Sequence, residues 1–197
     1  MCKTNKAPLD AEHLPESPLL VLGVTGSIAA YKAADLTSRL RQAGVEVQVI
    51  MTAAAQKLVC PQTFCTLSRH PVITDLWMMP DWQPGHVELA MRAVALLVMP
   101  ATANIIGKMA HGIADDALST YYLSHVGQVY VAPAMNPRMW AHPAVQANCR
   151  ILTGRGVHFI GPVAGPVACG EAGLGRLAAV DEIFAVMTRA LKPYFEE

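Results

Sequence analysis

Short aliphatic runs alternate with segments of helical spacing along most of this sequence. Runs that are apolar at nearly every position are typical of parallel strands buried on both faces of a sheet. Four such runs are Leu19–Val24, Ala95–Met99, Val129–Ala132 and Val157–Ile160, and Val45–Met51 predicts a fifth strand because apolar and polar residues alternate along it. Strands that alternate with helices are joined by right-handed crossovers, which place helices on both faces of the sheet. The pattern therefore predicts an α/β domain built around one parallel sheet.

The segments between these runs predict the helices and loops. We expect helices over Ile28–Ala43, Ala53–Val59, His86–Arg92, Ile105–Ala110, Asp115–Ser124, Ala144–Gly154 and Val180–Leu191. Gly44 is a typical residue just beyond a helix end, whereas Pro61 and Pro100 are expected to end a helix and a strand. Residues 62–85 and the stretch 161–175, which is rich in glycine and proline, are expected to form irregular loops.

Composition narrows the class of protein. The 197 residues suit one domain, so we expect a flexible leader over residues 1–18 and a single domain over 19–197. Lys and Arg together number 15, as do Asp and Glu, and this balance argues against a nucleic-acid partner or an acidic membrane surface. Hydrophobic residues make up 53% and charged residues 15%. That apolar surplus predicts subunit interfaces, and hence a homo-oligomer.

Cysteine use and hydropathy bear on where the protein works. The five cysteines form no CxxC pair, and an odd number without a signal peptide indicates reduced thiols in a cytoplasmic protein. No uninterrupted apolar run approaches the roughly 18 residues that a membrane helix needs. The sequence also has no HxH or HExxH pattern, so no metal site is predicted.

Candidate chemistry starts at the turn after the first strand, Gly23-Val24-Thr25-Gly26-Ser27-Ile28. Glycines let the backbone approach a ligand, and free N–H groups at the start of a helix favour a phosphate. The turn lacks the spacing of a dinucleotide site or of a Walker loop. It predicts a phosphate site for a mononucleotide, and the alternative is an ordinary turn in which Ser27 is the helix N-cap.

Two neighbouring strands end in similar turns, Pro100-Ala101-Thr102-Ala103-Asn104 and Pro133-Ala134-Met135-Asn136. Ligands of parallel α/β sheets bind at that edge. Small residues there leave room for a flat ring, to which Thr102 and Asn104 offer hydrogen bonds. The Asn136 amide can hold a carboxylate in a fixed orientation without adding charge. The alternative for Asn104 is capping of the next helix, and the alternative for Asn136 is turn formation.

Two further residues are candidates for proton transfer. His86 follows Pro84-Gly85 near the end of a loop, where an imidazole can exchange protons at neutral pH, although a surface or capping role is commoner for a histidine. The glycine-laced loop Ala168–Arg176 predicts a mobile flap over bound substrate. Its Cys169 thiol is mostly protonated at neutral pH and can donate a proton, and the alternative is a plain connection with an incidental cysteine.

Taken together, these segments resemble the flavin-containing cysteine decarboxylases. The matching stretches follow the family's order from residue 19 to 183, and the segments around Asn136 and Cys169 are the most specific of them. The stretches are Thr25–Lys32, Pro71–Trp77, His86–Ala90, Pro100–Asn104, Ala110–Asp116, Pro133–Asn136 with Met139-Trp140, and Ala168–Gly170 through Gly175-Arg176.

The resemblance implies a Rossmann-like three-layer fold with a parallel sheet, as in flavodoxin-like flavoproteins. It also implies FMN bound at the interfaces of a trimer, which sometimes assembles further into a dodecamer. The implied FMN-binding residues are Gly26, Ser27, Ile28, Thr52, Thr102, Ala103 and Asn104. The implied catalytic residues are His86, Asn136 as the grip on the substrate carboxylate, and Cys169 as the proton donor. The implied substrate-binding residues are Asn136, Met139, Gly170 and Arg176.

The implied activity is the decarboxylation of 4′-phosphopantothenoylcysteine to 4′-phosphopantetheine in coenzyme A biosynthesis. A cysteinyl carboxylate cannot simply lose carbon dioxide, because the carbanion left behind has nowhere to put its charge. Oxidation of the thiol-bearing carbon by the flavin lets the carboxyl group depart while the charge rests on sulfur. Cys169 would then protonate the enethiolate as the flavin is reoxidised, and His86 would assist positioning and deprotonation.

The sequence also leaves alternatives open. Arg92 and Val94 stand where the family often has an aromatic residue and an Asp. The chain ends at Glu197, so we expect that phosphopantothenoylcysteine synthetase, which is commonly fused to the decarboxylase in bacteria, is encoded separately. A peptidyl-cysteine decarboxylase that stops at the enethiol is the first alternative, although the Cys169 flap argues against it. A non-catalytic, flavin-binding regulatory subunit is the second. A prenyltransferase on the same fold has no use for Asn136 or Cys169.

Overall fold

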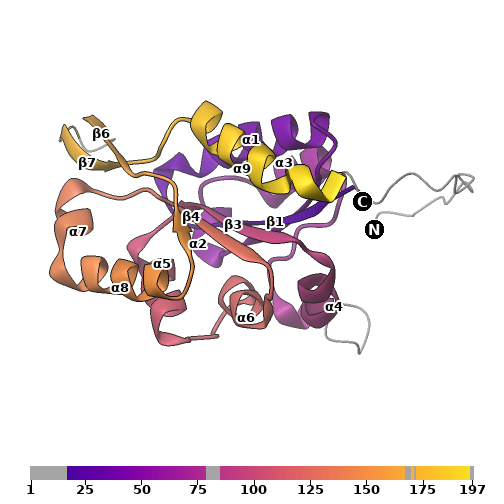
Figure 1. Cartoon of the computed structure of the whole chain (residues 1–197), viewed down its shortest axis with the longest axis horizontal. Helices are drawn as coiled ribbons and strands as arrows, with labels where there is room; N and C mark the ends of the chain where they lie inside the picture. The colour runs from indigo at the N-terminus through magenta and orange to yellow at the C-terminus, as the bar shows by residue number, and fades with distance from the viewer. Residues whose placement is uncertain (1–16, 79–84, 167–169, 171, 196–197) are drawn as a thin grey trace, which may run out of the picture.

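Five parallel strands form the central sheet in the order β2-β1-β3-β4-β5 (Figure 1). The structure is a computed structural model that describes residues 17–78, 85–166, 170 and 172–195, with the backbone alone for residues 78 and 85–88. The strands are β1 (Leu19–Val24), β2 (Glu46–Met51), β3 (Ala95–Ala101), β4 (Gln128–Pro133) and β5 (His158–Phe159). This order is that of flavodoxin-like folds, whose ligands bind where the strand order reverses. The reversal lies between β1 and β3.

Helices cover both faces of the sheet, as predicted (Figure 1). One face carries α1 (Tyr31–Gln42), α2 (Ala53–Gln56), α3 (Pro61–Ser68) and α9 (Val180–Leu191). The other carries α4 (Gly85–Arg92), α5 (Ala103–His111), α6 (Ala117–Ser124) and α8 (Pro143–Gly154). The short helix α7 (Pro137–Ala141) follows β4, and single 3-10 turns are η1 (Ile28–Ala30), η2 (Leu76–Met78) and η3 (Lys192–Phe195).

Strand β1 shows why the strands read as continuous apolar runs. Successive side chains of a strand point to opposite faces. Leu20 and Leu22 join the core beneath α1 and α9, whereas Leu19 and Val21 join the core beneath α5 and α6. A Cβ at Gly23 would lie 2.5 Å from Leu118 Cδ1, so α6 packs directly against the strand backbone there. Both faces of β1 are buried, and every residue of the strand is apolar for that reason.

Two prolines do not act as predicted. Pro61 occupies the first position of α3 and does not end a helix, because its missing N–H has no helical acceptor there. The preceding helix α2 already ends at Gln56. Pro100 does not end β3, which continues to Ala101. A register shift between Val98 and Ala101 accommodates the proline within the strand.

Two segments that were expected to be loops contain regular structure. Part of the stretch 62–85 belongs to α3 and η2, while residues 79–84 lie outside the described residues. The stretch 161–175 includes the antiparallel hairpin of β6 (Val163–Pro166) and β7 (Ala172–Arg176). Helix α7 was also missed. Its five residues are too few for the helical period to stand out in the sequence.

The state of the cysteine thiols and the length of the helices bear on the expected cellular location. Cys60, Cys65 and Cys149 are free thiols, and Cys2 and Cys169 lie outside the described residues. Burial raises the pKa of the Cys149 thiol. Among the helices that the structure describes, none is long and apolar enough to cross a membrane.

Candidate functional site

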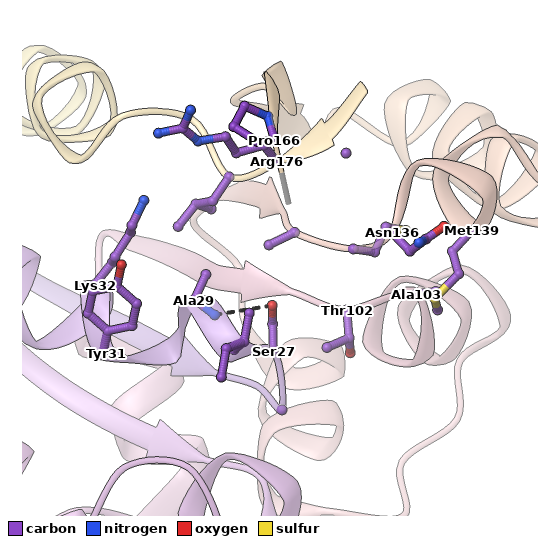
Figure 2. A pocket seen from close by; sticks show the side chains of 16 residues that line it. Ser27, Ala29, Tyr31, Lys32, Thr102, Ala103, Asn136, Met139, Pro166 and Arg176 are labelled. Atoms are coloured by element: carbon purple, nitrogen blue, oxygen red, sulfur yellow. Dashed lines mark hydrogen bonds between the residues drawn. The ribbon is translucent and has the colours of Figure 1, made fainter. Parts of the chain in front are cut away.

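A cavity of about 680 Å³ opens at the carboxyl edge of the sheet, where the turns after β1, β3 and β4 meet β7 (Figure 2). Cavities of this size are typical of small-molecule sites. Eight predicted site residues line it: Gly26, Ser27, Ile28, Thr102, Ala103, Asn136, Met139 and Arg176. The fold thus brings together residues from four separate segments of the chain at the point where the strand order reverses.

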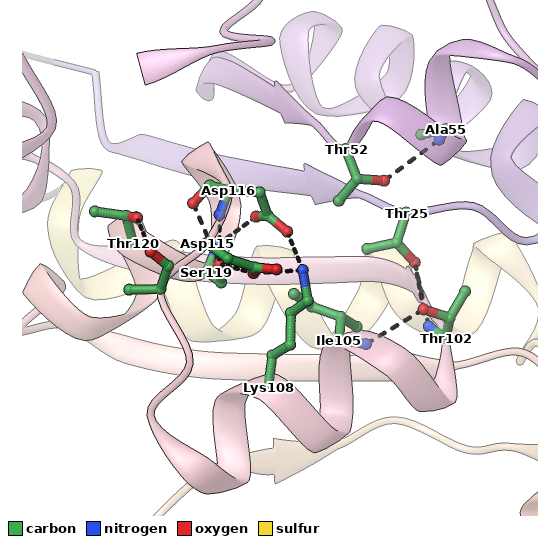
Figure 3. A network of polar contacts seen from close by, with 11 residues as sticks. Thr25, Thr52, Ala55, Thr102, Ile105, Lys108, Asp115, Asp116, Ser119 and Thr120 are labelled. Carbon is green, nitrogen blue, oxygen red and sulfur yellow. Dashed lines mark hydrogen bonds and ion pairs between the residues drawn. The ribbon is translucent and has the colours of Figure 1, made fainter. Parts of the chain in front are cut away.

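The ends of β1 and β3 are tied together by a buried hydroxyl (Figure 3). Thr25 is 1% exposed, and its Oγ1 donates a hydrogen bond to the carbonyl oxygen of Pro100 at 2.6 Å. The same oxygen accepts a hydrogen bond from the backbone N–H of Thr102 at 3.1 Å. This contact fixes the relative position of the two turns that form the floor of the cavity.

Each of the first four strands is followed by a polar residue that caps the next helix. The side-chain oxygen of each accepts a hydrogen bond from a backbone N–H in the first turn, at 2.8–3.4 Å. The four caps are Ser27, Thr52, Thr102 and Asn136. The capping alternative is therefore realised for Ser27, whereas Thr102 and not Asn104 caps α5, and Asn136, for which turn formation was the alternative, caps α7. Helix N-termini carry partial positive charge, so their convergence at this edge favours an anionic ligand.

Capping also orients the Asn136 side chain. Its Oδ1 accepts a hydrogen bond from the backbone N–H of Arg138 at 2.8 Å. This bond holds the amide plane in place at the start of α7, beside the cavity (Figure 2). A preset amide loses little conformational freedom when a ligand binds to it.

Gly26 has a structural reason to lack a side chain. A Cβ at this position would lie 2.5 Å from the Ala54 Cβ of α2. The glycine thus lets the turn after β1 pack against α2, and its close approach to a ligand stays a prediction.

The hairpin lies on the turn after β4. The backbone N–H of Met135 donates a hydrogen bond to the Gly175 carbonyl at 2.9 Å. A Cβ at Gly175 would lie 2.5 Å from the Met135 carbonyl oxygen, and one at Gly173 would lie 2.8 Å from Pro137 Cβ. These two glycines serve close packing of β7, so this strand of the predicted flap is anchored to the site.

The cavity has an apolar wall at the start of α1 and carries net positive charge. Ile28 and Tyr31 are 64% and 63% exposed, which is high for such large apolar side chains. Among the described residues that line the cavity, the charged ones are Lys32 and Arg176, with no carboxylate. Apolar walls, small residues and positive charge suit a flat organic molecule that carries an anionic group, which is the chemistry of a flavin mononucleotide.

Several predicted site residues lie away from this lining. Thr52 caps α2 and Asn104 is exposed on the first turn of α5, and neither contributes to the cavity wall. Gly170 is exposed and also lies outside the lining. His86 lies in the first turn of α4, where only the backbone is described, and Cys169 lies outside the described residues. The roles of all five stay predictions.

Arg92 and Val94, which stand where the family often has an aromatic residue and an Asp, lie at and just after the C-terminal end of α4, and neither lines the cavity. Arg92, in the last turn of α4, forms an ion pair with Glu46 at the start of β2. His70 Nε2 lies 3.3 Å from the same carboxylate. Val94 precedes β3 and packs against the core. Arg92 therefore links α4 to the edge strand of the sheet.

Sequence reasoning missed several lining residues, among them Tyr31, Lys32, Met135 and Pro166. A signal for two of them was present. Tyr31 and Lys32 follow Ile28 by three and four residues, so they share its face of a helix that starts at a predicted phosphate turn. Met135 and Pro166 reach the cavity through the contact between the hairpin and the β4 turn, which no local pattern indicates.

Comparison with known proteins identifies the family. A model of the flavoprotein family matches residues 10–192. The coenzyme A biosynthesis bifunctional protein CoaBC of Bacillus subtilis is 48% identical over 167 residues, which are 83% of this chain and 41% of that protein. The chain thus spans less than half the length of the bifunctional relatives that it matches.

Two further matches cover almost the whole length of the protein compared. A Streptococcus mutans protein, named a probable phosphopantothenoylcysteine decarboxylase, is 40% identical over 83% of this chain and 93% of its own. The solved structure of the FMN-dependent cysteine decarboxylase SpaF is 32% identical and covers 91% of this chain and 98% of its own, with a TM-score of 0.78. The family match agrees with the strand order and the edge cavity, and it confirms the recognition made from the motifs: the chain belongs to the flavoprotein family.

Proposed function

We propose that this protein is an FMN-dependent carboxy-lyase that converts 4′-phosphopantothenoylcysteine to 4′-phosphopantetheine in coenzyme A biosynthesis. The observation that carries the proposal is the shared cavity, which places the Asn136 amide and the Ser27 turn around one electropositive space. The Streptococcus mutans relative supports this substrate, because its similarity extends over 93% of that protein.

The cofactor of the proposal is FMN. Gly26, Ser27 and Ile28 would hold its phosphate at the turn after β1, and Thr102 and Ala103 would line its ring from the turn after β3. The name of SpaF supports FMN as the flavin. When bound, FMN supplies a reversible acceptor for the two electrons of the thiol-bearing carbon.

The protein's own groups orient the substrate and move its protons. Asn136 would hold the carboxylate that departs, with its amide preset by the bond from Arg138. Met139, which is 48% exposed, offers an apolar contact beside it. His86 would assist deprotonation, and Cys169 would return a proton to the enethiolate carbon. The apolar wall of Ile28 and Tyr31 would exclude water from the ring.

We further propose that the protein works in the cytoplasm as a homo-oligomer, a trimer or a dodecamer. Large apolar side chains on the surface support association. Trp77 and Met91 are 90% and 76% exposed, and a subunit interface would cover such side chains. Molar mass from light scattering on the purified protein tests the assembly, and a monomer would contradict it.

The decisive experiment combines a spectrum with mass spectrometry. Purified protein should show flavin absorption bands in about equimolar ratio to the chain and should release carbon dioxide from 4′-phosphopantothenoylcysteine. A protein that binds FMN yet leaves this substrate untouched would contradict the proposed function. An enethiol as the final product of the unmodified protein would favour the peptidyl-cysteine alternative.

Replacement of Cys169 tests its role as proton donor. Cys169→Ser should release carbon dioxide but accumulate the enethiol, because the last protonation lacks its donor. Cys60→Ser is the matched control, since this exposed thiol does not line the cavity. A saturated product from Cys169→Ser at the normal rate would remove the role assigned to Cys169.

A further inference from the structure

Two cations extend toward one end of the cavity, and the candidate carboxylate grip lies at the other. Figure 2 shows the Lys32 ammonium and the Arg176 guanidinium on the same side of the view, with Asn136 and Met139 on the opposite side. Ser27 and Thr102 lie between these two ends. All six residues line the same cavity. The cavity therefore has an amide end and a cationic end, joined by a wall of small hydroxyl residues.

The two cations come from segments that are far apart in the sequence. Lys32 lies in the first turn of α1 and is half-buried, whereas Arg176 ends β7 and is exposed. No ion pair joins either of them to a carboxylate within the described part of the chain. Two cations that line one cavity without an acidic partner give it positive charge, and this charge favours a bound anion.

The hairpin leaves space for the Arg176 side chain. The side chain crosses over Gly165 on the neighbouring strand of the hairpin. A Cβ at Gly165 would lie 3.1 Å from both Cδ and Nη1 of Arg176. The absence of a side chain at Gly165 thus leaves the space that the arginine side chain occupies.

The proposed substrate has an anion at each end. Its cysteinyl carboxylate and its phosphate are separated by the pantothenoyl chain, so a molecule held by its carboxylate at Asn136 must place its phosphate elsewhere. A phosphomonoester carries up to two negative charges and accepts hydrogen bonds from both arginine and lysine. A peptide that ends in an unmodified cysteine carries no phosphate ester.

On the basis of the proposed function, we infer that Lys32 and Arg176 form the subsite for the substrate phosphate. These two residues make the cavity selective for a phosphorylated, non-peptide cysteine substrate. Ser27 and its turn remain for the cofactor phosphate, because they lie between the cationic end and Asn136. Lys32 is a substrate-binding residue that the sequence motifs did not assign. Arg176, which the resemblance implied to bind the substrate, is assigned to its phosphate.

The test compares substrates and products with and without the phosphate. Carbon dioxide release is measured with 4′-phosphopantothenoylcysteine and with pantothenoylcysteine, on holoenzyme of Lys32→Met, Arg176→Met and the unmodified protein. Each variant should raise KM for the phosphorylated substrate roughly 10- to 100-fold, the loss expected for one charge-assisted contact. KM for pantothenoylcysteine should change less than about threefold. Lys32→Arg and Arg176→Lys should recover much of the lost affinity, and Lys192→Met is the control for loss of an exposed positive charge.

A binding measurement separates this inference from the proposed function. Calorimetric titration of FMN-loaded protein with 4′-phosphopantetheine and with pantetheine should show a preference for the phosphorylated compound, which Lys32→Met and Arg176→Met abolish. If that preference is present but no carbon dioxide is released, the subsite stands and the proposed function fails. Equal binding of the two compounds by the unmodified protein would overturn the inference. So would an equal rise in both KM values, or variants that lose affinity for FMN itself.

Discussion

At the residue scale, the buried hydroxyl of Thr25 holds together two of the turns that line the cavity. Thr25 joins the end of β1 to the end of β3 through Pro100 and Thr102. A threonine that is 1% exposed belongs to a hydrogen-bond network, because a buried polar group without a partner costs stability. The sequence places Thr25 in a turn, but its partners lie on another strand.

Substitution of Thr25 tests this joint. Thr25→Val keeps the shape of the side chain and removes its hydrogen bonds, so the Pro100 carbonyl and the Thr102 N–H lose a buried partner. The free energy of unfolding should fall by about 1–3 kcal/mol, and the affinity for FMN should fall as well, because the turns that line the site shift. Urea denaturation and flavin fluorescence titration measure the two effects. Thr25→Ser keeps the hydroxyl and should lie close to the unmodified protein; equal losses in both variants would show that the hydroxyl has no such role.

At the element scale, charge fixes the connection between α5 and α6 (Figure 3). Lys108 Nζ lies 2.5 Å from Asp115 Oδ1 and 2.7 Å from Asp116 Oδ2. Asp116 also caps α6, where its Oδ1 accepts a hydrogen bond from the Ser119 N–H at 2.8 Å. One carboxylate thus serves a helix start and an ion pair together, and this accounts for the Ala110–Asp116 motif as a structural element.

The pKa values of this cluster follow from the same contacts. Burial lowers the pKa of Lys108, but hydrogen bonds and charge from both carboxylates outweigh it and hold the pKa above its ordinary value. The hydrogen bond from Lys108 holds the pKa of Asp115 below its ordinary value. A carboxyl group with a lowered pKa stabilises the fold above about pH 4, and this contribution is lost as the pH falls below that value.

Two substitutions at Asp116 separate its cap from its charge. Asp116→Ala removes both and should lower the free energy of unfolding by about 1–2 kcal/mol. Asp116→Asn keeps a capping oxygen and should cost less, since it loses only the charge that faces Lys108. Thermal and urea unfolding at neutral pH provide the comparison. If the two variants are equally destabilised, the ion pair and not the cap dominates at this helix start.

At the scale of the whole molecule, the site joins elements from the beginning, the middle and the end of the described chain. The turns after β1, β3 and β4 meet the hairpin β6-β7, which follows all five strands of the described sheet in sequence. A ligand that contacts all of them binds the folded chain and not the unfolded one, so binding and folding are thermodynamically linked.

This linkage predicts a stabilising effect of FMN. At a concentration a hundredfold above its Kd, FMN should raise Tm by roughly 5–10 °C, because such a ligand adds about 2.7 kcal/mol to the stability of a domain of this size. Differential scanning calorimetry of flavin-free protein, with and without FMN, measures the shift. Riboflavin lacks the phosphate and should give a smaller shift. Identical Tm values with and without FMN would mean that the cavity does not take the cofactor.

Local sequence pattern determined most of the fold of this protein. It placed β1 and α9 at their observed bounds, and it located the other strands of the sheet within a few residues. It could do so because burial on both faces of the sheet leaves a continuous apolar run, and burial on one face of a helix leaves a period. Seven of the eight predicted site residues that line the cavity follow β1, β3 or β4, and they meet because turns after parallel strands share an edge. The eighth, Arg176, lies on the hairpin strand β7.

Only the tertiary structure decided what the remaining segments do. The glycines of the hairpin led to the prediction of a loop. They are needed because they approach the backbone of Met135 and the ring of Pro137, which are distant in sequence. The presence of Lys32 and Arg176 in the lining of one cavity depends likewise on the strand order and on where the hairpin lies. Such contacts join residues that are distant in sequence, and the local spacing of apolar and polar positions carries no record of them.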